Sequence, residues 1–362
     1  MCPYSWTAAS DAEHVFSPDD LDAMFKEAAE LSPLHLRGRP FPAVLDTDFI
    51  RTGLHSQLNW GSPPKSVRSA QNGSLRLFME YDTLVETDRK LPKFAGQLGV
   101  SVPELRRILN EDWLPHVDAV RLPPRFRELD PRAVLVRDGD GVRKRDKDDF
   151  PAASLTALLS PCLLLTHNHN HFSALGVRTR EQGLEGVTAV LAIKIGEVEL
   201  QAVVMVPALP LQLASAGVEW ATEKIGPTAW VILGLVIAGG IYWFVKQPPE
   251  RREKIKTVAA EIGKHFMEEY TQAAGIAHQG RLQLRACVVP EPELRSPISA
   301  ILRELARSTE SLSAAQIAEL LDPSLRPSVA EIRALLRAHD QTVFRQVRHG
   351  GYVLGSTYQL QD

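Results

Sequence analysis

Cysteine is scarce in this chain. Its 362 residues include three, Cys2, Cys162 and Cys287, which are far apart and odd in number. This usage argues against a disulfide framework and a cysteine-based metal site, and it fits a reducing compartment. The N-terminal residues lack a basic region followed by an apolar core, so we expect no secretory signal there.

A large net charge is also missing. The formal charge is -3, from 41 basic and 44 acidic side chains, so the chain as a whole does not attract nucleic acid. Any contact with nucleic acid would therefore depend on local patches of basic residues. The hydrophobic content of 44% and charged content of 23% are typical of globular proteins and argue against global disorder. The length predicts two or three structural units.

Short apolar strands alternate with helices in the first half of the chain. We expect strands at residues 41–50, 75–79, 133–136 and 162–166, and helices at 20–31, 83–98, 101–110 and 152–159. This alternation predicts an α/β fold, in which helices cover both faces of a parallel sheet.

Six segments are expected along the chain. The two folded domains cover residues 39–180, which are α/β, and residues 293–360 at the C-terminal end. Between them we expect a strand pair and linker at 181–224, an apolar helix at 225–246, and an amphipathic helix and linker at 247–290. A helical extension at 1–38 precedes the α/β domain.

Acidic residues follow the predicted strands. They are Asp46, Asp48, Glu86, Asp146, Asp148 and Asp149. The carboxyl ends of parallel strands meet at one sheet edge, where sites commonly form. Carboxylates gathered there repel one another unless a hard cation such as Mg²⁺ or Mn²⁺ neutralises them. Such a cation activates water and clamps a phosphodiester. The alternative is that these acids cap helices, as Asp149 would; for the whole set we favour a metal site.

Four segments resemble the bacterial PIN-domain nucleases that carry an Asp-x-Asp-Asp-aromatic-Pro signature. The segments are DTDFI, TLVETDRKLPKFAGQLGVS, RDKDDFPAASLTAL and LLLTHNHNHFSALGV, and the match runs from about Phe41 to Val177. The third segment, which contains Asp146 to Pro151, fits the signature most closely.

This resemblance implies a metal-dependent ribonuclease that cleaves single-stranded RNA and uses Mg²⁺ or Mn²⁺. It implies that Asp46, Glu86 and Asp149 are the catalytic acids and metal ligands, with Asp146 and Asn168 completing the metal shell. It also implies that Thr166 positions a ligand or water, and that two copies of the chain pair as a homodimer. An antitoxin or other protein partner is not identified by the sequence.

The last motif departs from the family pattern. Where the family usually reads Thr-x-Asp-x-Asp-Phe, this chain places Asn168 and Asn170 in the acidic positions. An amide oxygen still ligates a cation but adds no negative charge, so a second metal would bind more weakly. This departure favours an alternative function, a catalytically weak PIN scaffold in a DNA- or RNA-binding regulator.

The same stretch allows two other interpretations. It contains the letters His-Asn-His, but the strand and helix context of a ββα-metal nuclease is missing. His167, His169 and His171 would bind Zn²⁺ if they shared one strand face, which we consider a minor alternative. Otherwise they belong to a polar loop, where histidine is able to touch phosphate.

Basic residues lie directly beside the third motif. They are Arg143, Lys144, Arg145 and Lys147. A positive strip next to a metal centre suits the backbone of single-stranded RNA, which it would hold without sequence preference. A solvated loop remains an equal alternative, because Asp138 and Asp140 dilute the strip.

The C-terminal segment predicts a winged helix. Helices at 296–307, 313–321 and 328–339 precede a hairpin at 343–354, and the ending resembles the HARE-HTH type of helix-turn-helix. The resemblance implies that the third helix enters the major groove of duplex DNA, where Arg333, Arg337 and Arg348 would bind phosphates or bases. A protein-interaction module is the alternative.

One long segment is free of charge. Residues 225–245 are long enough to cross a bilayer, carry aromatic residues toward their ends, and precede a basic run. We expect membrane association through this segment, with both domains in the cytoplasm if residues 200–218 form the other arm of a membrane hairpin. A buried or re-entrant helix is the alternative.

Overall fold

A computed structural model describes residues 39–135, 148–199, 248–292, 296–325, 327–347 and 350–360. The predicted helix at 20–31, the basic strip at 143–147 with Asp146, and the apolar segment at 225–245 lie outside these residues. Within the described ranges, no helix is both long and apolar enough to cross a membrane.

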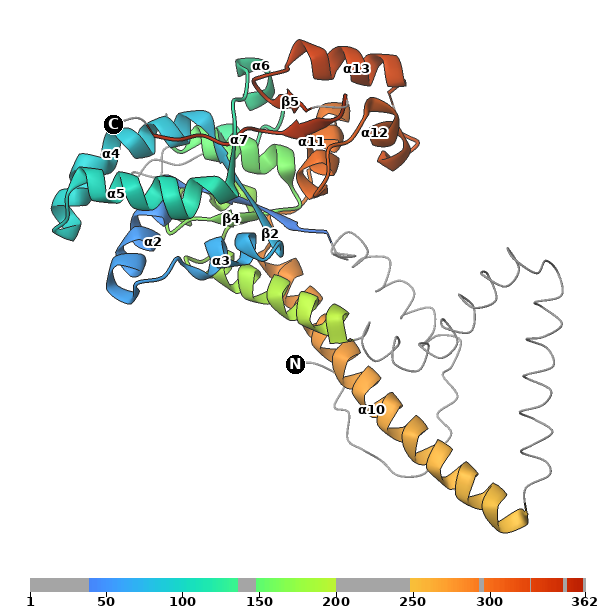
Figure 1. The fold of residues 1–362 in the computed structure, drawn as a ribbon. Helices are drawn as coiled ribbons and strands as arrows, with labels where there is room; N and C mark the ends of the chain where they lie inside the picture. The colour runs from blue at the N-terminus through green and yellow to red at the C-terminus, as the bar shows by residue number, and fades with distance from the viewer. Residues whose placement is uncertain are drawn as a thin grey trace. The chain divides into compact units, whose positions relative to one another are not determined.

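The centre of the α/β unit is a four-stranded parallel sheet with the strand order β3-β2-β1-β4 (Figure 1). The strands are β1 (Phe41–Leu45), β2 (Leu75–Glu80), β3 (Val117–Val120) and β4 (Leu163–Leu165). Every residue of β1 and β4 is buried. Burial on both faces explains why these strands are continuous apolar runs without alternating polar residues.

Helices flank this sheet, as the sequence predicted. They are α2 (Thr47–Trp60), α3 (Lys65–Gln71), α4 (Tyr81–Leu98), α5 (Val102–Ile108), α6 (Pro124–Arg127) and α7 (Phe150–Leu159). The Glu80 carboxylate caps α4 by accepting from the backbone N–H of Asp82, and Ser101 caps α5 by accepting from that of Glu104. All ten residues of α7 are buried, because this helix contacts both the sheet and the C-terminal helices.

Several local predictions were wrong. Residues 133–135 form a 3-10 helix, whereas the strand β3, which was not predicted, lies at Val117–Val120. A strand was expected at 187–194, but residues 182–199 are helical. Val187, Val190 and Ile193 are buried at a spacing of three residues, so the apolar pattern here is that of a helix. Residues expected to form a linker before 290 are largely the end of α10 (Pro249–Cys287).

The helix at 182–199 packs side by side with the C-terminal part of α10, shown in orange (Figure 1). Glycine permits this close approach. A Cβ atom at Gly196 would lie 2.7 Å from the backbone nitrogen of Ala277, and one at Gly280 would lie 2.9 Å from Cγ1 of Ile193. The two backbones therefore nearly touch, and a larger side chain at either glycine would separate them.

The C-terminal segment has the predicted order of elements. It contains α11 (Pro297–Arg307), α12 (Ala314–Leu320), α13 (Val329–Ala338) and the hairpin of β5 (Phe344–Gln346) and β6 (Tyr352–Leu354). Ser296, Ser313 and Ser328 each accept a hydrogen bond at the start of a helix. Serine at these positions explains where the three helices begin.

This segment is joined to the α/β unit, whereas the sequence predicted a separate domain. The helix α11 packs on α7, and side chains of both belong to one hydrophobic core. The hydroxyl of Ser299 donates to the carbonyl oxygen of Leu158 at 2.7 Å. Ser356 forms an antiparallel bridge with Ala119 at the β3 edge of the sheet. The C-terminal segment therefore stabilises the sheet that carries the acidic residues.

Candidate metal centre

Asp46 lies at the carboxyl end of β1, one of the two inner strands of the sheet, and only 1% of its surface is exposed. Its backbone N–H donates to the carbonyl oxygen of Leu165 at 3.1 Å. Its Oδ2 atom accepts a hydrogen bond of 2.7 Å from Oγ1 of Thr166, the residue that follows β4. Two neighbouring strands thus fix this carboxylate at the edge of the sheet where α/β proteins form their sites.

The charge on Asp46 is strongly disfavoured, because its pKa is raised from 3.8 to about 7. Burial is the largest cause. The nearby carboxylates of Asp149, Asp48 and Glu86 also raise this pKa, while the hydrogen bond from Thr166 lowers it. Like charges and burial both penalise the ionised form. The surroundings of Asp46 consequently have an excess of negative charge that a bound cation would relieve.

Glu86 lies on α4 and is also buried. Its Oε2 atom accepts a hydrogen bond of 2.8 Å from Oγ1 of Thr47, and its Oε1 atom forms an ion pair with Nζ of Lys90. Burial raises the pKa of Glu86, while the hydrogen bonds from Lys90 and Thr47 lower it. The carboxylate of Glu86 is therefore held mainly by an ammonium group of its own helix.

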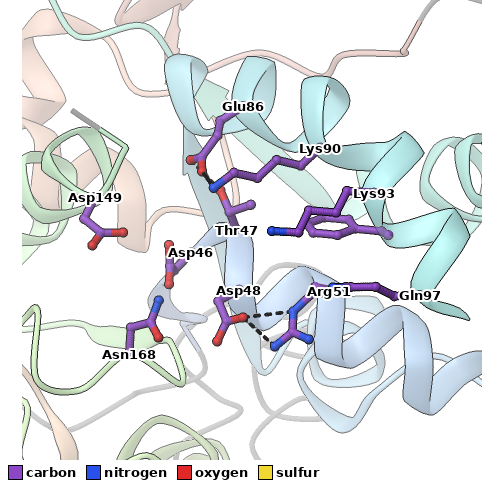
Figure 2. Close-up of a pocket in the computed structure, with 11 residues that line it drawn as sticks. Asp46, Thr47, Asp48, Arg51, Glu86, Lys90, Lys93, Gln97, Asp149 and Asn168 are labelled. Atoms are coloured by element: carbon purple, nitrogen blue, oxygen red, sulfur yellow. Dashed lines mark hydrogen bonds and ion pairs between the residues drawn. The ribbon is translucent and has the colours of Figure 1, made fainter. Parts of the chain in front are cut away.

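Asp149 occupies the N-cap position of α7, but its side chain makes no capping hydrogen bond. It contacts Nδ1 of His171 through Oδ2. Asp149 is therefore at the cap position, as the alternative interpretation predicted, but its side chain does not cap the helix. The backbone N–H of Asn168 donates to Oγ1 of Thr166 at 3.0 Å, so the turn after β4 brings the Asn168 side chain toward Asp46 (Figure 2).

These residues line a pocket of about 240 Å³. Figure 2 shows Asp46, Asp149 and Asn168 grouped on one side of it, and the basic chains of Arg51, Lys90 and Lys93 on the other. The full lining is Asp46, Thr47, Asp48, Arg51, Glu86, Lys90, Lys93, Phe94, Gln97, Asp149 and Asn168. The pocket combines an acidic side, suited to a cation, with a basic side, suited to an anion.

The donor chemistry fits a hard divalent cation, because carboxylate and amide oxygens are the ligands that Mg²⁺ and Mn²⁺ prefer. The side chains are nevertheless not gathered as a closed ligand set. Among the described residues, no three acidic, histidine or cysteine side chains form a group that could hold a metal ion. Lys90 binds Glu86, and Arg51 binds Asp48 at 2.7 Å, so basic chains already hold both carboxylates. The side chains that could bind such a cation are therefore those of Asp46, Asp149 and Asn168.

The structure brings four of the predicted metal ligands to one pocket, namely Asp46, Glu86, Asp149 and Asn168. Asp48 is in the first turn of α2, whereas the sequence predicted that it continues the strand. The predicted ligand Asp146 and the predicted nucleic-acid contacts Arg143, Lys144, Arg145, Lys147 and Arg348 lie outside the described residues. Arg333 and Arg337 are exposed on α13.

The basic side of the pocket was not predicted from the sequence. Lys90 follows Glu86 by one helical turn, and this spacing is a standard signal for an ion pair on a helix. Arg51 follows Asp48 by three residues, which is a comparable signal once this segment is taken as a helix and not as the expected strand. Lys93 had no such signal. The contact between His171 and Asp149 depends on the turn after β4, which the sequence did not reveal.

The three histidines are not arranged as a zinc site. Residues 167–172 form turns beyond β4, so His167, His169 and His171 do not share a strand face. The ring of His167 stacks on Phe49 with the centroids 5.6 Å apart, whereas His171 contacts Asp149. The prediction of a polar loop at the sheet edge agrees with this arrangement.

Comparison of the chain with protein family models, curated proteins and solved structures gives no match. The proposals about function therefore rest on the sequence, the fold and the pocket.

Proposed function

We propose that this chain is a metal-dependent nuclease of the PIN type that hydrolyses phosphodiester bonds in single-stranded RNA. The observation that carries the proposal is the position of Asp46. It is a buried carboxylate at the end of an inner parallel strand, surrounded by three other carboxylates that raise its pKa. Such a costly cluster of like charges is typical of a functional site rather than of a structural one.

The acidic side of the pocket would hold the cation. Asp46, Asp149 and Asn168 would bind Mg²⁺ or Mn²⁺, which supplies a Lewis acid and an activated water for attack on phosphorus. The hydroxyl of Thr166 orients Asp46 through its hydrogen bond, and the ring of His171 holds Asp149. Both contacts fix the carboxylates before a cation arrives.

The basic side of the pocket favours a phosphodiester substrate. Lys93 is exposed and, in the part of the chain that the structure describes, forms no ion pair, while Arg51 is partly neutralised by Asp48. A single strand would place its phosphates along these cations and its scissile bond over the acids. A peptide or neutral sugar would leave the cations unused, so an anionic polymer is the substrate class we propose.

Cleavage of a labelled single-stranded RNA by the full chain with Mn²⁺ tests this proposal. We expect Asp149→Asn to reduce the rate at least about 100-fold, since loss of a metal ligand costs more than loss of its outer partners. Glu111→Gln is the control, because Glu111 is an acid on the surface, 59% exposed, that pairs with Arg107. Equal rates in the parent and Asp149→Asn would disprove a catalytic role for the acidic pocket.

A second candidate is a nucleic-acid-binding regulator that uses the same fold with little or no cleavage. The exposed Arg333 and Arg337 on α13 favour it, as does the neutral Asn168 in the pocket. In this case the chain would bind duplex DNA through the winged helix, and Arg337→Gln would reduce the salt dependence of binding by about one unit of slope. Binding without cleavage in Mn²⁺ would favour this candidate over the nuclease.

We also propose that residues 225–245 attach the chain to a membrane and that both folded parts lie in the cytoplasm. The uncharged sequence and the basic residues after it support this proposal. Fractionation of cells that produce the full chain, compared with a chain lacking 225–245, would test it. Recovery of both chains in the soluble fraction would refute it.

A further inference from the structure

One ammonium group lies among the carboxylates of the pocket. Lys90 projects from α4, where its Nζ atom pairs with Oε1 of Glu86 and lies 3.5 Å from Oδ2 of Asp148. Glu86 is only 7% exposed at its side chain, and Lys90 is 35% exposed. The pair therefore forms part of the inner wall of the pocket (Figure 2).

Lys90 contacts the carboxylates of Glu86 and Asp148 but not that of Asp46. Glu86 and Asp148 are both held by Lys90. Among the described residues, no lysine or arginine forms an ion pair with Asp46. Its Oδ2 atom accepts a hydrogen bond from the neutral hydroxyl of Thr166. A divalent cation would thus neutralise the negative charge around Asp46. The charge of Glu86 is already neutralised by the ammonium group of Lys90.

We infer that Lys90 is a built-in cation that replaces a second metal ion, so that the pocket binds one divalent cation. This inference rests on the proposed function, and it specifies that function further. The single ion is placed at Asp46, Asp149 and Asn168. A second ion at Glu86 would have to displace an ammonium that makes two contacts, and like charges at such short range repel strongly.

Glu86 has a different role in this arrangement from the one that the family resemblance implies. It positions Lys90 and is not a metal ligand. The hydroxyl of Thr47, which donates to the second oxygen of Glu86 at 2.8 Å, fixes the carboxylate so that its other oxygen faces Lys90. Lys90 then presents the third hydrogen of its ammonium to the pocket, where a phosphate oxygen is able to accept it.

Titration of the full chain with Mn²⁺ alone, followed by electron paramagnetic resonance of the free ion, tests this assignment. We expect the parent to bind one equivalent of Mn²⁺. Lys90→Met, which keeps the length of the side chain without its charge, should bind a second equivalent. Lys93→Met removes a charge from the same pocket without freeing Glu86, and it should bind one equivalent, as the parent does.

A second variant separates the two roles of Glu86. If Glu86 only positions Lys90, Glu86→Gln should leave the affinity for the single Mn²⁺ within about threefold of the parent, whereas loss of a true ligand weakens binding by about tenfold or more. This measurement decides the question even if Lys90→Met fails to fold.

Three results would overturn the inference. One equivalent of Mn²⁺ in folded Lys90→Met, with unchanged affinity, would show that Lys90 excludes no ion. Binding of two equivalents of Mn²⁺ by the parent would also show that Lys90 does not exclude a second ion. Absence of binding in every variant would refute the metal centre itself, and with it the proposed nuclease, so the two failures are distinguishable.

Discussion

Arg76 and Asp118 pair across two neighbouring parallel strands. The Nε atom of Arg76, on β2, donates to Oδ2 of Asp118, on β3, at 2.8 Å. The same guanidinium donates through Nη1 to the carbonyl oxygens of Leu305 and Ser308, each at 2.7 Å. One side chain of the sheet thus holds the end of α11, and the C-terminal segment is attached to the sheet by hydrogen bonds as well as by apolar packing.

Replacement of Arg76 by Gln should therefore destabilise the whole chain. The variant loses hydrogen bonds from a charged donor and leaves Asp118, only 19% exposed, without its partner. We expect a loss of about 2–3 kcal/mol in the free energy of unfolding. Urea denaturation measures it, and the dependence of the unfolding free energy on urea concentration should not change. Arg107→Gln is the control, since Arg107 pairs with Glu111 on the surface with both side chains 59% exposed. Equal destabilisation by the two substitutions would argue against the docking role.

Removal of the C-terminal segment should prevent the α/β unit from folding cooperatively. A chain of residues 1–292 exposes the face of α7 that packs on α11 and loses the bridge from Ser356 to Ala119. We expect a broad thermal transition and binding of a hydrophobic dye, as in partly packed states. A chain of residues 1–360 is the control, because it keeps the hydrogen bond from the backbone of Leu360 to Asn110. A sharp transition at the parental temperature for 1–292 would contradict a shared core.

The stability of the metal-free chain should fall as the pH rises. The pKa of Asp46 is raised to about 7 from 3.8, so folding favours its protonated form. Its contribution to stability is full below about pH 4 and is lost as the pH rises through 7. Asp46→Asn is neutral throughout, so its stability relative to the parent should increase between pH 4 and pH 8 by up to about 4 kcal/mol.

This pH dependence is measured by denaturation in the presence of a chelator. Saturating Mn²⁺ should restore the stability of the parent at pH 8, because the ion favours the ionised form of Asp46, and it should do little for Asp46→Asn. A difference between the two chains that does not vary with pH would show that the charge of Asp46 is not disfavoured in the folded state.

Two glycines of α10 should respond in opposite directions to alanine. A Cβ atom at Gly275 would meet no atom within 4 Å, so Gly275→Ala should stabilise the chain by about 0.5–1 kcal/mol through helix propensity. Gly280→Ala places a Cβ atom 2.9 Å from Cγ1 of Ile193 and 3.1 Å from the carbonyl oxygen of Ala189. We expect it to destabilise the chain by about 1–3 kcal/mol. Stabilisation by both, in thermal denaturation, would show that the two helices are not in close contact.

Much of the fold followed from local signals in the sequence. Apolar runs bounded by turn residues located β1, β2 and β4, and the order of three helices and a hairpin was predicted for the C-terminal segment. The strand β3 was missed because its four residues, Val-Asp-Ala-Val, carry little pattern of their own. The helix at 182–199 was mistaken for strands because its β-branched residues favour extended structure, although Val187, Val190 and Ile193 recur at helical spacing.

The sequence by itself determined the α/β class, the helical order of the C-terminal segment and the position of acids after the strands, since these depend on periodicity and on short-range capping. Only the tertiary structure shows which carboxylates pair with basic side chains and which face one another in the pocket. Lys90 and Arg51 hold Glu86 and Asp48, while Asp46 is left facing Asp149, because α2, α4 and the turn after β4 converge at one edge of the sheet. The attachment of the C-terminal segment by Arg76 was not predictable either, since the carbonyl groups that Arg76 binds are more than 200 residues away in the chain.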